Sequence, residues 1–168
     1  MAEKSRRRVV EWTDPAGLAE EALTMSGLEY LKRMRDGLID NAPVALLVGF
    51  KLVEVEEGRA VFEIEPAEHQ YNPFGTLHGG VTAGVIDAAT GCAVHSTLPA
   101  GAGFTSLEIK VNYVRPVTTE TGLLRCEGRV VHTGNRIAVT ESRVTDREGK
   151  LYAFGVSTVM IFRQGRKK

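Results

Sequence analysis

The feature that most limits how this chain folds is the apolar segment Gly79–Val94, in which Asp87 is the only charged residue. Its apolar side chains recur at helical spacing, at Val81, Val85, Ala88 and Cys92. The spacing predicts one helix from Gly79 to about Thr97. Because a helix this apolar has no face that favours water, the rest of the fold must bury it.

Strand-like segments flank the predicted helix on both sides. Two precede it and four follow it, separated by turn-forming residues. They are Val44–Glu56, Arg59–Glu65, Phe104–Val114, Gly122–His132, Ile137–Thr145 and Leu151–Phe162. The order predicts an α+β domain in which a curved antiparallel sheet wraps one long helix.

Strict alternation in Phe104–Val114 predicts which side chains face the core. One face would carry Leu107, Ile109, Val111 and Tyr113. The opposite face would carry Ser106, Glu108, Lys110 and Asn112. By this alternation Ser106 and Ile109 are expected on opposite sides of the sheet.

The chain is predicted to be one domain with short additions at its ends. Residues 1–40 are expected to form an arm and one or two short helices between Leu18 and Leu38, interrupted at Ser26-Gly27. Residues 41–163 would form the domain, and residues 164–168 a basic tail.

Composition favours a soluble cytoplasmic protein. Twenty-one Lys and Arg balance 21 Asp and Glu, so no net field attracts nucleic acid or anionic membranes. No segment reaches the roughly 18–20 apolar residues of a membrane span, and the start lacks a signal-peptide pattern. Cys92 and Cys126 are expected as free thiols, and no metal site is predicted, because Cys92 and His95 have no second ligand pair.

Asp87 has two interpretations from the helix alone. Burying an ionised carboxylate without partners is costly, so it either accepts hydrogen bonds that fix helix packing or acts as a base or nucleophile. The preceding segment bears on this choice. Gly79 and Gly80 at the helix start leave unpaired N–H groups beside the positive end of the helix dipole, which suits an anion or a developing oxyanion.

Asn72, His78-Gly79-Gly80 and Asp87, at these spacings, form a specific set when followed by the strand ending Asn112–Pro116. The set resembles the hotdog-fold acyl-CoA thioesterases of the phenylacetate-pathway (PaaI) type, and the likeness runs from about Val44 to Phe162. The resemblance implies the hotdog fold, hydrolysis of an acyl-CoA to a free acid and CoA, and no cofactor beyond the CoA of the substrate. It favours the functional interpretation of Asp87.

Catalytic roles follow from the resemblance. Asp87 would be nucleophile or general base, and the Gly79 N–H would polarise the thioester carbonyl. Asn72 would orient the Asp87 carboxylate or the attacking water, His78 would position the loop, and Ser106 would help to hold the water. The alternative for Ser106 is an ordinary solvent-side strand serine.

Substrate contacts are predicted around this set, at Gly80, Thr90, His69, Phe74 and Arg136. Thr90 either binds the Asp87 carboxylate or its own helix backbone. His69, Gln70, Tyr71 and Phe74 border the motif and are expected to line the acyl pocket, which would suit aromatic or medium-chain groups. Arg136 is a candidate contact for a CoA phosphate.

If Gly79 and Asp87 act on one substrate, as the resemblance implies, helix geometry requires a second chain. Gly79 and Asp87 are eight residues apart and therefore about 12 Å apart along one helix. A thioester carbonyl needs both groups within about 3 Å. Asp87 must therefore work with Gly79 of another chain, which predicts a homodimer with two sites, or a dimer of dimers. The rival functions are a non-catalytic acyl-CoA-binding module and a hotdog enoyl-CoA hydratase or dehydratase.

Overall fold

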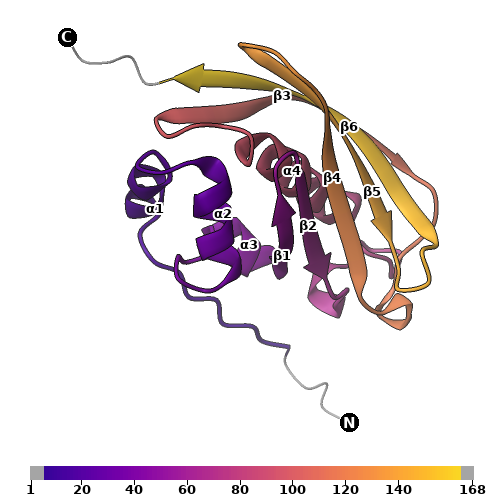
Figure 1. Ribbon diagram of the computed structural model, residues 1–168. Coiled ribbons are helices and arrows are strands. Elements are labelled where there is room, and N and C mark those ends of the chain that lie inside the picture. The colour runs from indigo at the N-terminus through magenta and orange to yellow at the C-terminus, as the bar shows by residue number, and fades with distance from the viewer. Residues whose placement is uncertain (1–5, 164–168) are drawn as a thin grey trace.

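The computed structural model describes residues 6–163. One antiparallel sheet of six strands, in the order β1-β2-β4-β5-β6-β3, curves around helix α4 (Gly79–His95), as Figure 1 shows. The strands are β1 (Phe50–Glu56), β2 (Arg59–Ile64), β3 (Ala102–Tyr113), β4 (Leu124–Thr133), β5 (Ile137–Thr145) and β6 (Leu151–Arg163). The expected architecture of a sheet wrapped around one helix is therefore confirmed. The predicted tail, residues 164–168, lies outside the described residues.

Helix α4 touches the sheet with its backbone as well as its side chains. Its inward residues Ile86 and Ala89 are fully buried. A Cβ built on Gly128 of β4 would lie 2.4 Å from the carbonyl oxygen of Ala89, well inside van der Waals contact. The absence of a side chain at Gly128 therefore allows the helix to rest directly on β4.

The N-terminal segment adds three short helices beside the sheet. They are α1 (Pro15–Ala22), α2 (Gly27–Arg35) and α3 (Pro43–Val48). The predicted interruption at Ser26-Gly27 is the start of α2, where the Ser26 hydroxyl accepts a hydrogen bond from the Glu29 N–H at 3.3 Å. Tyr30 and Leu31 of α2 pack into the main core, so α2 is part of the folded domain.

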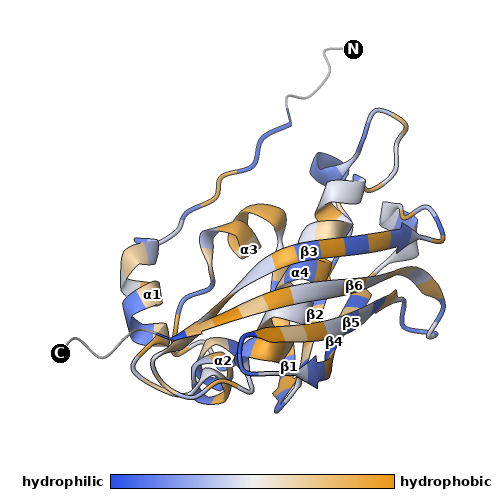
Figure 2. Ribbon diagram, turned by 90° about the horizontal axis from the view of Figure 1, so that it is seen from above, coloured by the Kyte–Doolittle hydropathy of each residue, from blue (hydrophilic) through white to orange (hydrophobic). Residues whose placement is uncertain are grey.

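The predicted strand Val44–Glu56 is wrong in its first half. Pro43 opens α3, and Gly49 ends it with a left-handed φ of 93°, so the strand begins only at Phe50. Pro suits the first position of a helix, and Gly suits the residue that follows one. A short apolar run has no periodicity that separates helix from strand. In Figure 2, α3 is largely orange, as this composition requires.

Strand β3 departs from strict alternation. The register with β6 shifts between Ser106 and Glu108, so Leu107 is an extra residue in a β-bulge. Leu107 is exposed, whereas Ile109 packs on the core. The bulge reverses the phase of the strand, and Ser106 faces α4 on the same side as Ile109. The predicted assignment of these two residues to opposite faces is therefore wrong.

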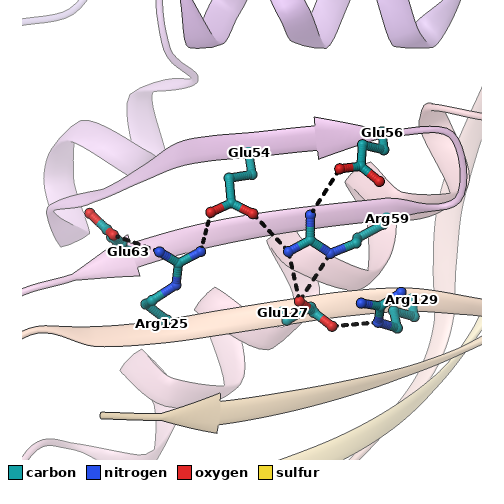
Figure 3. Close-up of polar contacts among 7 residues, drawn as sticks. All are labelled: Glu54, Glu56, Arg59, Glu63, Arg125, Glu127 and Arg129. Carbon is teal, nitrogen blue, oxygen red and sulfur yellow. Dashed lines mark hydrogen bonds and ion pairs between the residues drawn. The ribbon is translucent and has the colours of Figure 1, made fainter. Parts of the chain in front are cut away.

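Seven charged residues form an ion-pair network on the outer face of β1, β2 and β4 (Figure 3). Arg59 lies at its centre, 2.7 Å from a Glu54 oxygen and 2.8 Å from a Glu127 oxygen. Arg125 and Arg129 extend the network on either side. Val61 alternates with Arg59 and Glu63 on the same face of β2 and is only 1% exposed.

None of the helices among residues 6–163 has the length and apolarity needed to cross a membrane.

Replacing Gly128 by Ala should destabilise the fold by about 3 kcal/mol, because the added methyl group forces the α4 backbone away from β4. Gly17→Ala is the matched control, since a Cβ at Gly17 in α1 meets nothing within 4 Å. Chemical denaturation of both variants measures the difference. Equal stability of the two would contradict the close approach.

Arg59→Met should lower the free energy of unfolding by about 1–2 kcal/mol at pH 7, because it removes the central charge of the network. Methionine keeps an apolar side chain of similar length at this position. Hydrogen bonds from Arg125 and Arg59 hold the pKa of Glu54 below its usual value. A carboxylate with a depressed pKa contributes stability above its unfolded pKa and loses it as the pH falls. The difference in stability between wild type and variant should therefore shrink below about pH 4.5. Melting curves from pH 7 to pH 3 test this, and a difference independent of pH would count against the network.

Candidate active site

Asp87 and Ser106 lie together in the hollow between α4 and β3. The Ser106 hydroxyl donates a hydrogen bond to Asp87 Oδ1 at 2.6 Å. Within residues 6–163 it is the carboxylate's hydrogen-bond partner, which leaves Oδ2 for another group. This hydrogen bond depends on the bulge at Leu107, because the bulge brings Ser106 to the inner face of the sheet.

An apolar cavity of about 280 Å³ opens beside Asp87. Its walls come from α4, from phenylalanines of three strands and from the segment that connects α2 to α3. The strand residues are Phe50, Phe62 and Phe104. A ligand group bound in such an apolar cavity would lie beside the Asp87 carboxylate with little water around it.

The start of α4 presents one unpaired backbone donor. His78 caps the helix, and its Nδ1 accepts a hydrogen bond from the Gly80 N–H at 2.9 Å. The Gly79 N–H cannot bond within its own helix, and it makes no hydrogen bond to the part of the chain that the structure describes. His78 thus occupies the Gly80 donor and leaves the Gly79 donor available.

Gly79 lines a second cavity, of about 340 Å³, together with Asn72, Tyr113 and Arg115. Asp87 is not among the residues of this cavity, and Gly79 is not among those of the first. Two cavities of one chain therefore hold the two groups that the sequence assigns to one reaction. This separation agrees with their distance along α4.

Asn72 shapes the loop before α4. Its Oδ1 accepts hydrogen bonds from the N–H groups of Phe74 and Thr76, and its Nδ2 donates to the Thr76 hydroxyl at 2.9 Å. Within one chain Asn72 is thus brought to Gly79 and not to Asp87. A contact with Asp87 of a second chain stays a prediction.

The other predicted substrate residues are dispersed. Thr90 is fully buried, and its hydroxyl donates to the backbone carbonyl of Ile86 at 2.8 Å, which is the second of its two predicted alternatives. His69 lies 2.6 Å from an Arg8 nitrogen, away from both cavities, and burial and Arg8 lower its pKa. Phe74 is 90% exposed at the loop tip. Arg136 is an exposed residue in the turn before β5.

Two residues take roles at the site that the sequence did not assign to them. Tyr113 donates a hydrogen bond to the Gly79 carbonyl at 2.9 Å, and its ring leaves little room for a side chain there. Gln70 is buried, accepts a hydrogen bond from the Ala67 N–H and donates to the Val48 carbonyl. Its own carbonyl accepts from the His78 N–H at 2.9 Å. Tyr113 stands in the strand-end segment Asn112–Pro116. Gln70 was expected to line the acyl pocket, but it is not part of the lining of the cavity beside Asp87.

Cys92 and His95 of α4 are neutral structural residues. Burial, together with the Asp87 charge, raises the pKa of the Cys92 thiol to about 12. Burial lowers the pKa of His95 to about 4, and its ring packs against Tyr30 and Phe104. No group of three or more His, Cys, Asp or Glu among residues 6–163 is arranged to hold a metal ion.

A family model and several curated relatives that this chain is similar to are all described as thioesterases or acyl-CoA hydrolases. The family model described as the thioesterase superfamily matches residues 74–153. A 1,4-dihydroxy-2-naphthoyl-CoA hydrolase of Listeria monocytogenes is 29% identical over 68% of this chain and 91% of its own length. Human acyl-coenzyme A thioesterase 13 is 31% identical over 64% of this chain and 76% of its own.

A solved structure of a phenylacetic acid degradation-related protein from Ralstonia eutropha extends the likeness to the fold. It superposes with a TM-score of 0.71 and 27% identity, over 78% of this chain and 98% of its own. By family model, relatives and fold together, the chain belongs to the thioesterase superfamily, as a thioester hydrolase with the hotdog fold.

Proposed function

We propose that the protein hydrolyses acyl-CoA thioesters with an aromatic acyl group, such as phenylacetyl, or a medium-chain acyl group. The observation that carries this proposal is the Asp87 carboxylate, held by Ser106 at the edge of an apolar cavity. The relatives support it, since one is named for an aromatic acyl-CoA and another as an acyl-CoA thioesterase.

Asp87 acts as general base or as nucleophile. The Ser106 hydroxyl fixes one carboxylate oxygen, and the other meets the attacking water or the thioester carbon. As a base, Asp87 takes a proton from water while the water oxygen bonds to the carbonyl carbon. The C–S bond then breaks, and the proton passes to the CoA sulfur as it leaves. As a nucleophile, Asp87 would form a mixed anhydride that water cleaves.

Gly79 supplies the oxyanion donor. Its free N–H at the start of α4 points where the helix dipole also favours negative charge. His78 keeps this arrangement in place by capping the neighbouring N–H of Gly80. Tyr113 holds the Gly79 carbonyl and so fixes the orientation of the peptide groups beside it.

Two chains complete each site. Gly79 and Asp87 line separate cavities within one chain, so the donor of one chain meets the carboxylate of another. Among residues 6–163, the 12-residue strand β3 pairs only with β6, and its other edge offers backbone groups to a second copy. The assembly is a homodimer or a dimer of dimers, and it would place Asn72 of one chain beside Asp87 of the other.

Asp87→Asn should lower turnover by two or more decades, because the amide accepts no proton and is no nucleophile. Release of free CoA, followed with a thiol dye, measures this on phenylacetyl-, hydroxyphenylacetyl-, benzoyl-, hexanoyl- and palmitoyl-CoA. Ser106→Ala should lower turnover less than Asp87→Asn does, since it leaves the Asp87 carboxylate in place. Binding of every acyl-CoA without hydrolysis by wild type would favour a non-catalytic binding module instead.

Gly79→Pro should lower kcat about 10²- to 10³-fold, because it removes the oxyanion donor. Pro suits the first position of a helix, and the His78 ψ of 134° suits a residue that precedes Pro. Gly79→Ala adds the same Cβ beside Tyr113 but keeps the N–H, so it is the matched control.

Mixing the two inactive variants tests the arrangement across chains. A heterodimer of Asp87→Asn and Gly79→Pro chains contains one intact site if Asp87 works with Gly79 of the other chain. Random exchange of subunits should then restore about a quarter of wild-type activity. No restoration after exchange, verified by tagged subunits, would show that each site lies within one chain.

A further inference from the structure

We infer that the segment from the end of α2 to α3 forms the far wall of the acyl site, and that Met34 on this wall limits the acyl group to a compact, uncharged one. The inference rests on the proposed function and assigns its substrate size to a particular element. This segment lies before residues 74–153, so the family match does not include it.

The wall is built from three pieces of the N-terminal segment. Met34 comes from the last turn of α2, Asn41 and Ala42 from the connection, and Val44 and Ala45 from α3. They face Asp87, Ala88 and Cys92 of α4 across the cavity. The loop residues His69 and Phe74, which the sequence suggested for this pocket, are not part of its lining.

The opposite side of the cavity is rigid. Phe50 and Phe62 pack edge to face with ring centroids 5.7 Å apart. Phe104 is fixed against α4 so closely that a Cβ on Gly91 would lie 2.6 Å from its ring. Because the aromatic side has no room to yield, the length of the acyl group is decided at the Met34 side.

Size is the first constraint on the ligand. An apolar cavity of about 150 Å³ is enough to bind benzene. The 280 Å³ beside Asp87 therefore holds one aromatic ring with a short linker, or a chain of about six carbons. A palmitoyl chain, with sixteen carbons, is more than twice as long as the chain that this volume holds.

Charge is the second constraint. No Lys or Arg contributes to the lining, and Asp87 is its one ionised group. The Cys92 thiol stays protonated because burial raises its pKa. An acyl group with a terminal carboxylate would find no partner there and would be repelled by Asp87. The cavity therefore excludes dicarboxylic acyl groups.

Hydrogen bonds hold the wall in position. The last carbonyls of α3 accept from Arg8 at Leu46 and Leu47, and from Gln70 at Val48. Since Gln70 also accepts from the His78 N–H, the wall is joined to the start of α4. The wall is thus a fixed part of the site.

The test is a chain-length profile of kcat/KM from acetyl- to decanoyl-CoA for wild type, Met34→Ala and Met34→Trp. Each acyl methylene that gains burial is worth about fourfold. Met34→Ala should therefore raise the decanoyl-to-hexanoyl ratio at least about tenfold. Met34→Trp should lower hexanoyl and phenylacetyl turnover by a similar factor and leave acetyl-CoA, which does not reach the wall, within about twofold.

Lys32→Ala is the matched control, because Lys32 is exposed on the same helix and absent from the cavity. Folding of each variant is verified by its melting temperature. An unchanged chain-length profile in folded Met34→Ala would overturn the inference.

Calorimetry with hexyl- and decyl-CoA thioethers, which are not hydrolysed, separates this inference from the proposed function. If wild type hydrolyses no substrate, the proposed function fails. A higher decyl-to-hexyl affinity ratio in Met34→Ala would then still support the wall. An unchanged affinity ratio would overturn it.

Discussion

The direct contact between the α4 backbone and β4 determines the geometry on which the rest of the structure depends. At Gly128 the helix lies too close to the sheet for even one methyl group. That distance brings Asp87 within hydrogen-bond reach of a serine on β3. A helix held higher above the sheet by ordinary side chains would leave the carboxylate without that partner. One glycine on a strand therefore controls the surroundings of an acid on the facing helix.

Helix α4 holds two fixed polar groups, a backbone N–H at its start and a carboxylate in its middle. At its start, backbone groups are arranged by His78 and Tyr113 so that a single N–H stays open. In its middle, a carboxylate is oriented by Ser106 beside an apolar cavity. The two groups lie at separate points of one helix, and the helix fixes the spacing between them.

Much of the fold could be predicted from the sequence because its pattern is local. The apolar segment around Asp87 is a helix of nearly the predicted length, and Ile137–Thr145 is a strand with the predicted bounds. The five apolar residues after Pro43 show no periodicity that separates helix from strand, so α3 was not predicted. The phase change in β3 was also missed, since a bulge depends on pairing with β6 and leaves no mark in alternation.

In the candidate site, the residues on α4 could be predicted from the sequence, but the wall of the cavity could not. The motif identified Gly79, His78 and Asp87, whose positions follow from one helix. The cavity wall was assigned to the neighbouring loop, although it comes from residues more than forty positions before Asp87. Such a wall depends on how α2 and α3 pack, which no spacing within the motif encodes. Gln70 was expected in the acyl pocket for the same reason, because its tertiary hydrogen bonds leave no mark in the spacing of the motif.

The way α3 is anchored affects how the protein tolerates change. Arg8 and Gln70 donate hydrogen bonds to backbone carbonyl groups of α3, and these groups are present whichever side chains the helix carries. The exposed side chain of Val44 in α3 can therefore be exchanged while the helix keeps its place. Under the proposed function, single substitutions there would change the substrate preference and leave Asp87 and Gly79 untouched.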